Sequence, residues 1–200
     1  MTGELFDQGA NRLGALALRL ADRIQVAVTA EGAHSLSAAT ALSAIERFFV
    51  DGPSIDALGK VLGLTSSGAV RLVDSLETAG LVTRRRGGDG RVSVIVLTAK
   101  GRRSAARITD ARAKVLSDAL ASLTADERDT FDAVVDKILI ALVQGPSPGP
   151  AMCRLCATEV CGAERGQPCP VTILALSGAD DSMAGDHPTT DRQHDRSTSR

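Results

Sequence analysis

The chain has 200 residues, which suits one or two small domains, and 44% of them are hydrophobic, so most of it can bury a core. Aromatic residues make up only 2%, with no Trp or Tyr, which nearly excludes the stacking platforms that bind single-stranded nucleic acid. The net charge of −1 hides a basic middle, because residues 54–103 carry nine Lys or Arg against four Asp or Glu. Such a segment favours a polyanionic partner.

The sequence gives no sign of export or of membrane insertion. The first residues, MTGELFDQ, contain acidic side chains and no apolar stretch, so no signal peptide is predicted. No apolar run approaches the ~20 residues of a membrane span. We therefore expect a cytoplasmic protein without membrane contact.

Two helices are predicted ahead of the basic segment. Residues 5–29 place apolar side chains three and four positions apart, which is the helical period. A helix of this length in a small domain often packs against a partner chain. Ser37 is the predicted N-cap of a second helix over residues 38–50, and Asp51-Gly-Pro ends it.

The basic segment opens with two short helices. The first, over residues 55–62, ends at Gly63, and Thr65 caps the second, over residues 66–79. Two helices about three residues apart, with glycine in the turn, are typical of a helix-turn-helix. The residues of the second helix that we expect to face the core are Val70, Val73 and Leu76.

A β-hairpin is predicted next. Residues 81–83 and 92–97 are apolar and β-branched, and they bracket a basic, glycine-rich turn that runs from Arg84 to Arg91. A hairpin directly after a helix-turn-helix has the shape of a wing. Three consecutive arginines on a strand would alternate in direction, so not all of them would reach the same ligand.

Two more helices complete the regular structure. Thr98 caps a helix over residues 99–122, and Thr124 with Glu127 forms a capping box that opens a last helix to about residue 143. The apolar faces of the first, fifth and sixth helices are too long for a small core to cover. We therefore expect a two-fold homodimer built from these helices.

At this point the residues resemble a known family. The run LGKVLGLTSSGAVRLVDSLETAGLV (58–82), the arginines, and D-x-R-x-x-x-I-x-L-T-x-x-G (89–101) are similar to the MarR family of bacterial dimeric winged-helix transcription regulators. Ile95 replaces a leucine of the family pattern, and Gly90 stands where the family often has a second arginine. The resemblance covers about residues 5–143. It implies a mainly α fold with a small β-wing, that is, a winged helix-turn-helix domain plus long dimerisation helices, with the DNA-binding core at 37–101 and the wing at about 81–97.

The resemblance also implies double-stranded DNA as the partner. The helix over 66–79 would enter the major groove, where Arg71 can reach guanine or a phosphate, and the wing would enter the minor groove. By resemblance, Asp89 braces the wing and Arg91 meets DNA. The predicted DNA-binding residues are Thr65, Ser66, Ser67, Gly68, Arg71, Arg84, Arg85, Arg86, Asp89 and Arg91.

A cysteine segment follows outside the usual family core. A Pro/Gly linker (144–150) leads to a cysteine-rich segment (151–176) and then to a polar tail (177–200) that is expected to be disordered. Four thiolates can bind zinc, but the spacing also leaves open an iron–sulfur cluster, a thiol switch, or no cofactor at all. The predicted metal ligands are Cys153, Cys156, Cys161 and Cys169.

The sequence thus predicts a transcription regulator rather than an enzyme. No phosphate loop, Ser/His/Asp order or carboxylate pair stands out. We expect a dimeric repressor that binds a pseudo-palindromic operator with half-sites roughly 10 bp apart, and that responds to a small-molecule effector, a metal or a redox signal. The alternative is a metal-binding scaffold whose winged helix contacts protein.

Overall fold

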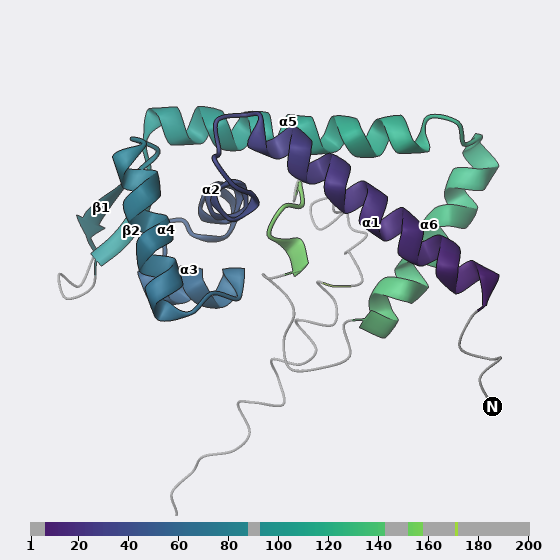
Figure 1. Cartoon of the computed structure of the whole chain (residues 1–200), viewed down its shortest axis with the longest axis horizontal. Coiled ribbons are helices and arrows are strands. Elements are labelled where there is room, and N and C mark those ends of the chain that lie inside the picture. The colour runs from purple at the N-terminus through teal and green to yellow at the C-terminus, as the bar shows by residue number, and fades with distance from the viewer. Residues whose placement is uncertain (1–6, 88–92, 143–151, 158–170, 172–200) are drawn as a thin grey trace, which may run out of the picture.

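The computed structural model describes residues 7–87, 93–142, 152–157 and 171. Figure 1 shows a head at one end of the molecule and a long arm that leads away from it. We call α2, α3, α4, β1 and β2 the head, and α1, α5 and α6 the arm. The elements are α1 (Gln8–Thr29), α2 (Leu36–Phe48), α3 (Ile55–Leu62), α4 (Ser66–Thr78), β1 (Val82–Arg86), β2 (Ser93–Leu97), α5 (Ala99–Leu120) and α6 (Ala125–Leu142).

Side-chain caps define where most helices begin. The predicted caps Ser54, Thr65 and Thr98 are confirmed, because each hydroxyl accepts a hydrogen bond from a backbone N–H three residues on. For α2 the prediction of Ser37 was wrong: the hydroxyl of Ser35 accepts from the N–H of Ala38 at 3.1 Å. Both serines have the same capping chemistry, so the local sequence does not choose between them.

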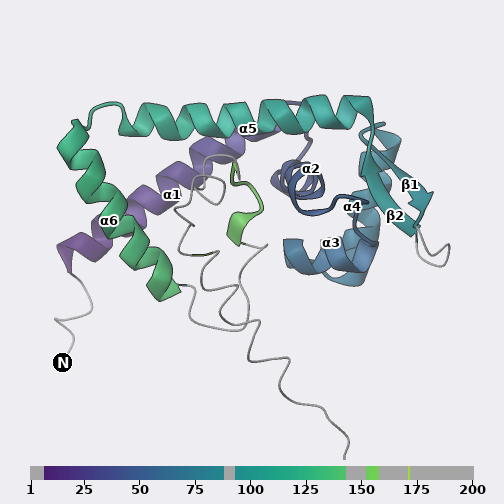
Figure 2. The same ribbon diagram turned by 180° about the vertical axis from the view of Figure 1, so that it is seen from behind.

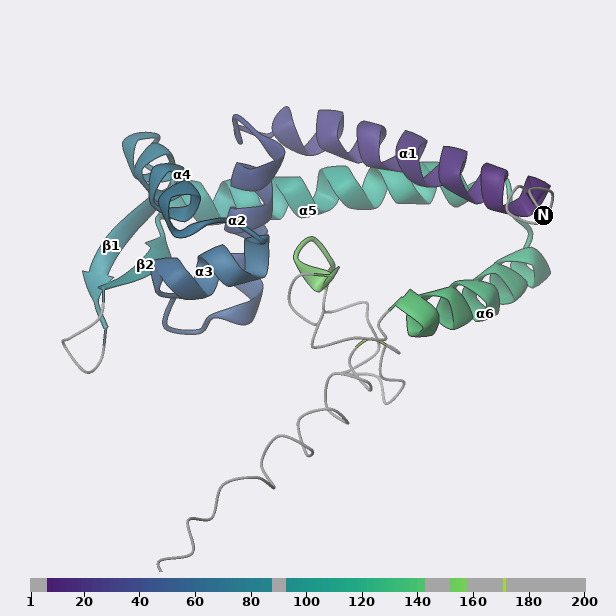
Figure 3. The same cartoon turned by 60° about the horizontal axis from the view of Figure 1, so that its bottom comes forward.

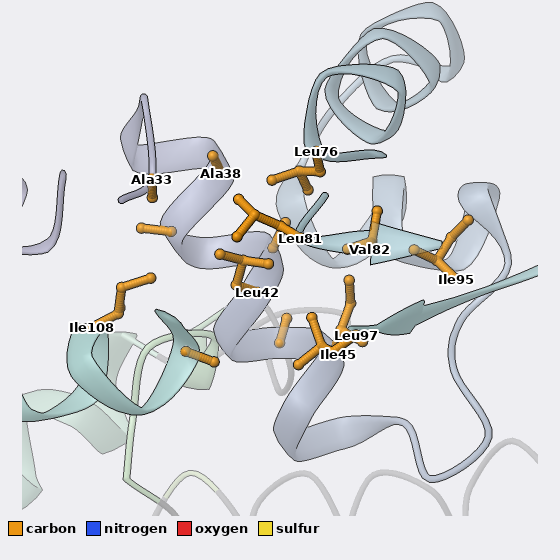
Figure 4. Close-up of a cluster of buried hydrophobic side chains, with 14 of the residues drawn as sticks. Ala33, Ala38, Leu42, Ile45, Leu76, Leu81, Val82, Ile95, Leu97 and Ile108 are labelled. Atoms are coloured by element: carbon orange, nitrogen blue, oxygen red, sulfur yellow. The ribbon is translucent and has the colours of Figure 1, made fainter. Parts of the chain in front are cut away.

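The core is aliphatic, as the composition requires, and α2 lies at its centre. Leu42 and Ile45 of α2 are buried against the hairpin, α4 and α5. Figure 4 shows side chains from all these elements pointing toward one another. The labelled members beyond α2 include Leu76, Leu81, Val82, Ile95, Leu97 and Ile108. This cluster joins the hairpin, α4 and the arm into one packed unit.

The first turn of α5 is fixed to the base of the wing. A Cβ atom at Gly101 would lie 2.0 Å from the carbonyl oxygen of Leu81, so only glycine allows this approach. The hydroxyl of Thr98 donates to the carbonyl of Gly80 at 2.7 Å. The ammonium of Lys100 donates to the carbonyl of Ala79 at 2.8 Å and so satisfies the C-terminal end of α4. The arm therefore starts from the head at a fixed position.

The far end of the arm is poorly covered. Helix α1 packs along α5, whereas α6 turns back from the end of α5 (Figures 2 and 3). Within the described part of the chain, no residue of α6 is buried. Leu13 and Leu16 of α1 are each 48% exposed, and Leu142 of α6 is 66% exposed. No helix in the described ranges is both long and apolar enough to cross a membrane.

Candidate nucleic-acid interface

The buried face of α4 determines which side chains are left for a ligand. Val73 and Leu76 are buried as predicted, but Val70 is 41% exposed, so that prediction was wrong. Ala69 is buried in its place. The reason is the close approach of α3: a Cβ atom at Gly59 would lie 3.2 Å from the Cβ of Ala69. Two small residues meet there, and this contact rotates Val70 outward.

The exposed face of α4 combines small, apolar and basic side chains. Ser66, Ser67 and Arg71 are exposed beside Val70. Thr65 is exposed too, but its hydroxyl is used as the cap, because it accepts from the N–H of Gly68 at 3.2 Å. The sequence analysis predicted Val70 in the core. Ala69, Val73 and Leu76 are spaced four and three residues apart, and this helical spacing was the signal that could have shown Val70 to be exposed.

The arginine run lies in a strand rather than in the turn. Strand β1 includes Arg84, Arg85 and Arg86 and pairs antiparallel with β2, so that Arg84 faces Ile95 and Arg86 faces Ser93. The expectation that strand residues end at 83 was therefore wrong. The cross-strand pairs extend the sheet to the third arginine, because backbone hydrogen bonding does not depend on the side chains.

Arg84 is held by α4. Its guanidinium donates to Asp74 at 2.5 Å and also to Glu77, and its backbone N–H donates to a second oxygen of Glu77 at 3.1 Å. The hydrogen bond with Asp74, followed by the charges of both carboxylates, raises the pKa of Arg84 above its ordinary value despite partial burial. Arg84 therefore fixes the wing to α4. No local pattern in the sequence predicts that Arg84 pairs with these two carboxylates.

Arg85 and Arg86 remain exposed. Arg85 lies on the wall of a hollow of about 360 Å³ that Glu46 of α2 and Arg102 of α5 also line. The predicted wing residues Asp89 and Arg91 lie outside the described residues. Of the predicted DNA-binding set, the structure thus places six residues on the exposed surface of the head and leaves Gly68 half-buried. The exposed six are Thr65, Ser66, Ser67, Arg71, Arg85 and Arg86.

The predicted metal ligands are only partly covered by the structure. Cys153 and Cys156 lie in the described turn 152–157 and are half-buried, whereas Cys161 and Cys169 lie outside the described residues. Among the residues that are described, no group of three or more His, Cys, Asp or Glu side chains could hold a metal ion. Zinc and an iron–sulfur cluster therefore stay predictions.

Comparisons with known proteins agree with this architecture. Residues 35–92 match the sequence model of the MarR family. MepR, a transcription regulator of the Staphylococcus aureus multidrug efflux pump MepA, is 18% identical with a TM-score of 0.61, over 68% of this chain and 99% of its own. A MarR family protein from Bacillus stearothermophilus is 22% identical with a TM-score of 0.62, over 72% and 99%.

A third solved structure, the transcriptional repressor CouR bound to a 23-mer DNA duplex, is 24% identical with a TM-score of 0.55, over 71% of this chain and 97% of its own. No curated protein sequence matches the chain. The predicted resemblance to the MarR family is confirmed by the family match, and the predicted winged-helix fold is confirmed by the structural likeness.

Proposed function

We propose that this chain is a cytoplasmic transcription regulator that binds double-stranded DNA as a homodimer and represses the genes it controls. The observation that supports this most directly is the exposed face of α4, which presents Ser67, Val70 and Arg71, together with the exposed Arg85 and Arg86 of the wing. The match of residues 35–92 to the MarR family supports a DNA-binding role for this face.

Helix α4 would read the major groove. Ser66 and Ser67 are short, so the helix backbone can sit deep, and the N–H groups of its first turn suit a phosphate oxygen. Arg71 can donate to O6 and N7 of guanine. Val70 adds an apolar group of the kind that contacts the methyl group of thymine. The face therefore offers hydrogen-bond donors for G·C pairs and an apolar contact for A·T pairs.

The wing would hold the phosphate backbone and the minor groove. Arg85 and Arg86 are exposed on β1 and supply positive charge there. Arg84 contributes indirectly, because its ion pairs with Asp74 and Glu77 fix the angle between the wing and α4. In this proposal Arg85 and Arg86 contact DNA, whereas Arg84 positions the wing.

The uncovered end of the arm supports the homodimer. Leu13 and Leu16 of α1 and Val134 of α6 are each 48% exposed, and Leu142 is more exposed still. A second copy of the chain, related by a two-fold axis, would cover these apolar side chains. Two heads would then address half-sites roughly 10 bp apart. Val134→Asp should convert the dimer to a monomer in light scattering, and an unchanged mass would contradict this interface.

A cavity of about 570 Å³ between head and arm suits a small effector. Ile24, Leu36 and Leu155 give it a mostly apolar wall, and Arg112 adds a positive charge. Volumes in this range accept small molecules. An effector there would lie against both α1 and α2, so its binding can change the position of the head relative to the arm.

Selection from random DNA duplexes tests the DNA-binding function. We expect enrichment of a pseudo-palindrome whose affinity falls steeply with salt concentration. Arg71→Ala should weaken binding to the selected duplex about 10- to 100-fold, whereas Arg19→Ala, an exposed charge on α1, serves as the matched control. A failure to enrich any duplex would contradict the proposal.

Charge reversal on the wing tests the alternative of a protein-binding scaffold. Arg85→Glu with Arg86→Glu should abolish duplex binding, because it replaces two exposed positive charges of the wing with negative charges that the DNA phosphates repel. Arg84 is left intact, since its reversal would disrupt the contacts with α4. A variant that retains full DNA affinity would favour the scaffold. A reporter gene behind the selected operator then distinguishes repression from activation.

A further inference from the structure

The described turn 152–157 lies at the junction of head and arm, where it lines a cavity with α1, α2 and α5. Figures 1 and 3 show it between α2 and the arm. Leu155 packs against the hydrophobic core that α2 and the hairpin share with α1 and α5. Met152, Cys153, Leu155 and Cys156 are all half-buried. A segment outside the part of the chain that matches the MarR family model therefore contacts the folded unit.

This turn forms one wall of the cavity described above. Met152, Arg154 and Leu155 face Ile24 of α1, Leu36 of α2 and Arg112 of α5 across it. The turn thus contacts the same space as one helix of the head and two helices of the arm. Any change in the turn alters the packing where head and arm meet.

The backbone of the turn brings its two cysteines close together. The N–H of Cys156 donates to the carbonyl of Cys153 at 2.8 Å. This hydrogen bond closes a turn whose first and last Cα atoms lie within about 7 Å. A disulfide spans Cα distances of roughly 4.4–6.8 Å. The Cα separation of this closed turn therefore falls in the range where a disulfide can form.

We propose that Cys153 and Cys156 form a reversible disulfide that locks this turn between head and arm. The oxidant is a hydroperoxide. One thiolate attacks the peroxide oxygen, which forms a sulfenic acid and releases water, or an alcohol from an organic peroxide. The second thiol then displaces hydroxide from the sulfenic acid as water. Two thiols lose two electrons and two protons, and the peroxide O–O bond takes them up.

The disulfide stabilises the conformation of the turn in which Leu155 packs against the core. It removes conformations in which the two ends of the turn separate, so Leu155 stays packed against the core more of the time. The head then moves less freely relative to α1 and α5. The effect on DNA rests on the proposed function: a dimer whose heads are restricted in this way binds its operator with a different affinity.

Peptide mapping of the full chain tests the disulfide directly. Trypsin cuts after Arg154, between the two cysteines, and a glutamate-specific protease cuts after Glu159, which separates Cys156 from Cys161. After treatment with hydrogen peroxide we expect the peptide that ends at Arg154 to be linked to residues 155–159, and dithiothreitol should release it. Links to Cys161 or Cys169 instead, or zinc that protects the thiols, would overturn the proposal.

Hydrogen exchange tests the lock without DNA. Oxidation should slow exchange in the turn and in the facing parts of α1 and α2, and the double variant Cys153→Ser, Cys156→Ser should show no such change. Leu155→Ala keeps both thiols and should lose the protection while the disulfide still forms. Equal exchange in oxidised and reduced wild-type chain would overturn the lock.

The last measurement is the affinity for the selected duplex. Oxidation should change Kd about fivefold or more in the wild type and leave the double serine variant within twofold. If the reduced chain binds no duplex, the proposed DNA-binding function fails, and the peptide map and hydrogen exchange still decide the disulfide. If the wild type binds equally well in both states, regulation by this turn is refuted.

Discussion

Replacing Arg84 tests whether this wing arginine stabilises the fold by its contacts with α4 rather than by contacting DNA. Arg84→Ala removes the hydrogen bonds and ion pairs to Asp74 and Glu77 and leaves two carboxylates close together on α4. The guanidinium is 30% exposed and the carboxylates 56% and 37%, so solvent screens both pairs. At about 0.2–1 kcal/mol for each such pair, the expected loss of stability from the two pairs is about 0.4–2 kcal/mol.

Thermal unfolding and DNA titration together measure this effect. The loss corresponds to a fall in Tm of about 1–8 °C for a chain of this size. Arg84→Lys keeps the charge but lacks the fork that reaches both carboxylates, so we expect an intermediate Tm. In a double-mutant cycle with Glu77→Gln, the two changes should be non-additive by about 0.5 kcal/mol or more.

The salt dependence of DNA binding separates the two roles. Arg86→Ala, an exposed neighbour on the same strand, should reduce the salt slope by about one unit and leave Tm unchanged. Arg84→Ala should lower Tm and leave the slope as in the wild type. If Arg84→Ala instead reduced the slope with no change in Tm, Arg84 would be a DNA ligand and the assignment to α4 would be refuted.

Three further predictions follow from packing and capping. Gly101→Ala should destabilise the fold by more than a surface change, because its Cβ would lie 2.0 Å from the Leu81 carbonyl oxygen, and urea unfolding measures the loss. Leu42→Ala removes a fully buried side chain and should cost about 2–5 kcal/mol in the same assay, and a loss below about 1 kcal/mol would contradict the core as described. The Thr124 backbone N–H, followed by its hydroxyl, lowers the pKa of Glu127. The charged form is thus favoured in the folded state, and its stabilisation is present at neutral pH and lost as pH falls through the folded pKa. Glu127→Ala should therefore lower Tm at pH ~7, with a difference that shrinks toward pH ~3, and a pH-independent difference would contradict the capping box.

Local sequence chemistry determined where most elements begin and end. Ser54, Thr65 and Thr98 are caps because a hydroxyl at the start of a helix satisfies a backbone N–H wherever the helix later packs. The Gly63 turn adopts φ 65°, a conformation that glycine adopts without strain. With the basic, glycine-rich hairpin, these signals sufficed to predict a winged helix.

Local chemistry failed where two neighbours offered the same interaction. Ser35 and Ser37 can both cap α2, and the folded chain uses Ser35. Val70 and Ala69 both allow an apolar face on α4. The close approach to Gly59 on α3 selected the smaller residue for the interior, and this contact exists only once the two helices meet.

Contacts between distant segments were decided by the tertiary structure alone. Arg84 pairs with Asp74 because β1 returns beside α4. Leu155 contacts the hydrophobic core because the turn 152–157 returns to the junction of head and arm. Periodicity and capping act over one or two helical turns, so the sequence determined the elements and their polarity. The partners of an ion pair or a cavity wall depend on how those elements pack, and packing sums many contacts between residues far apart in the chain.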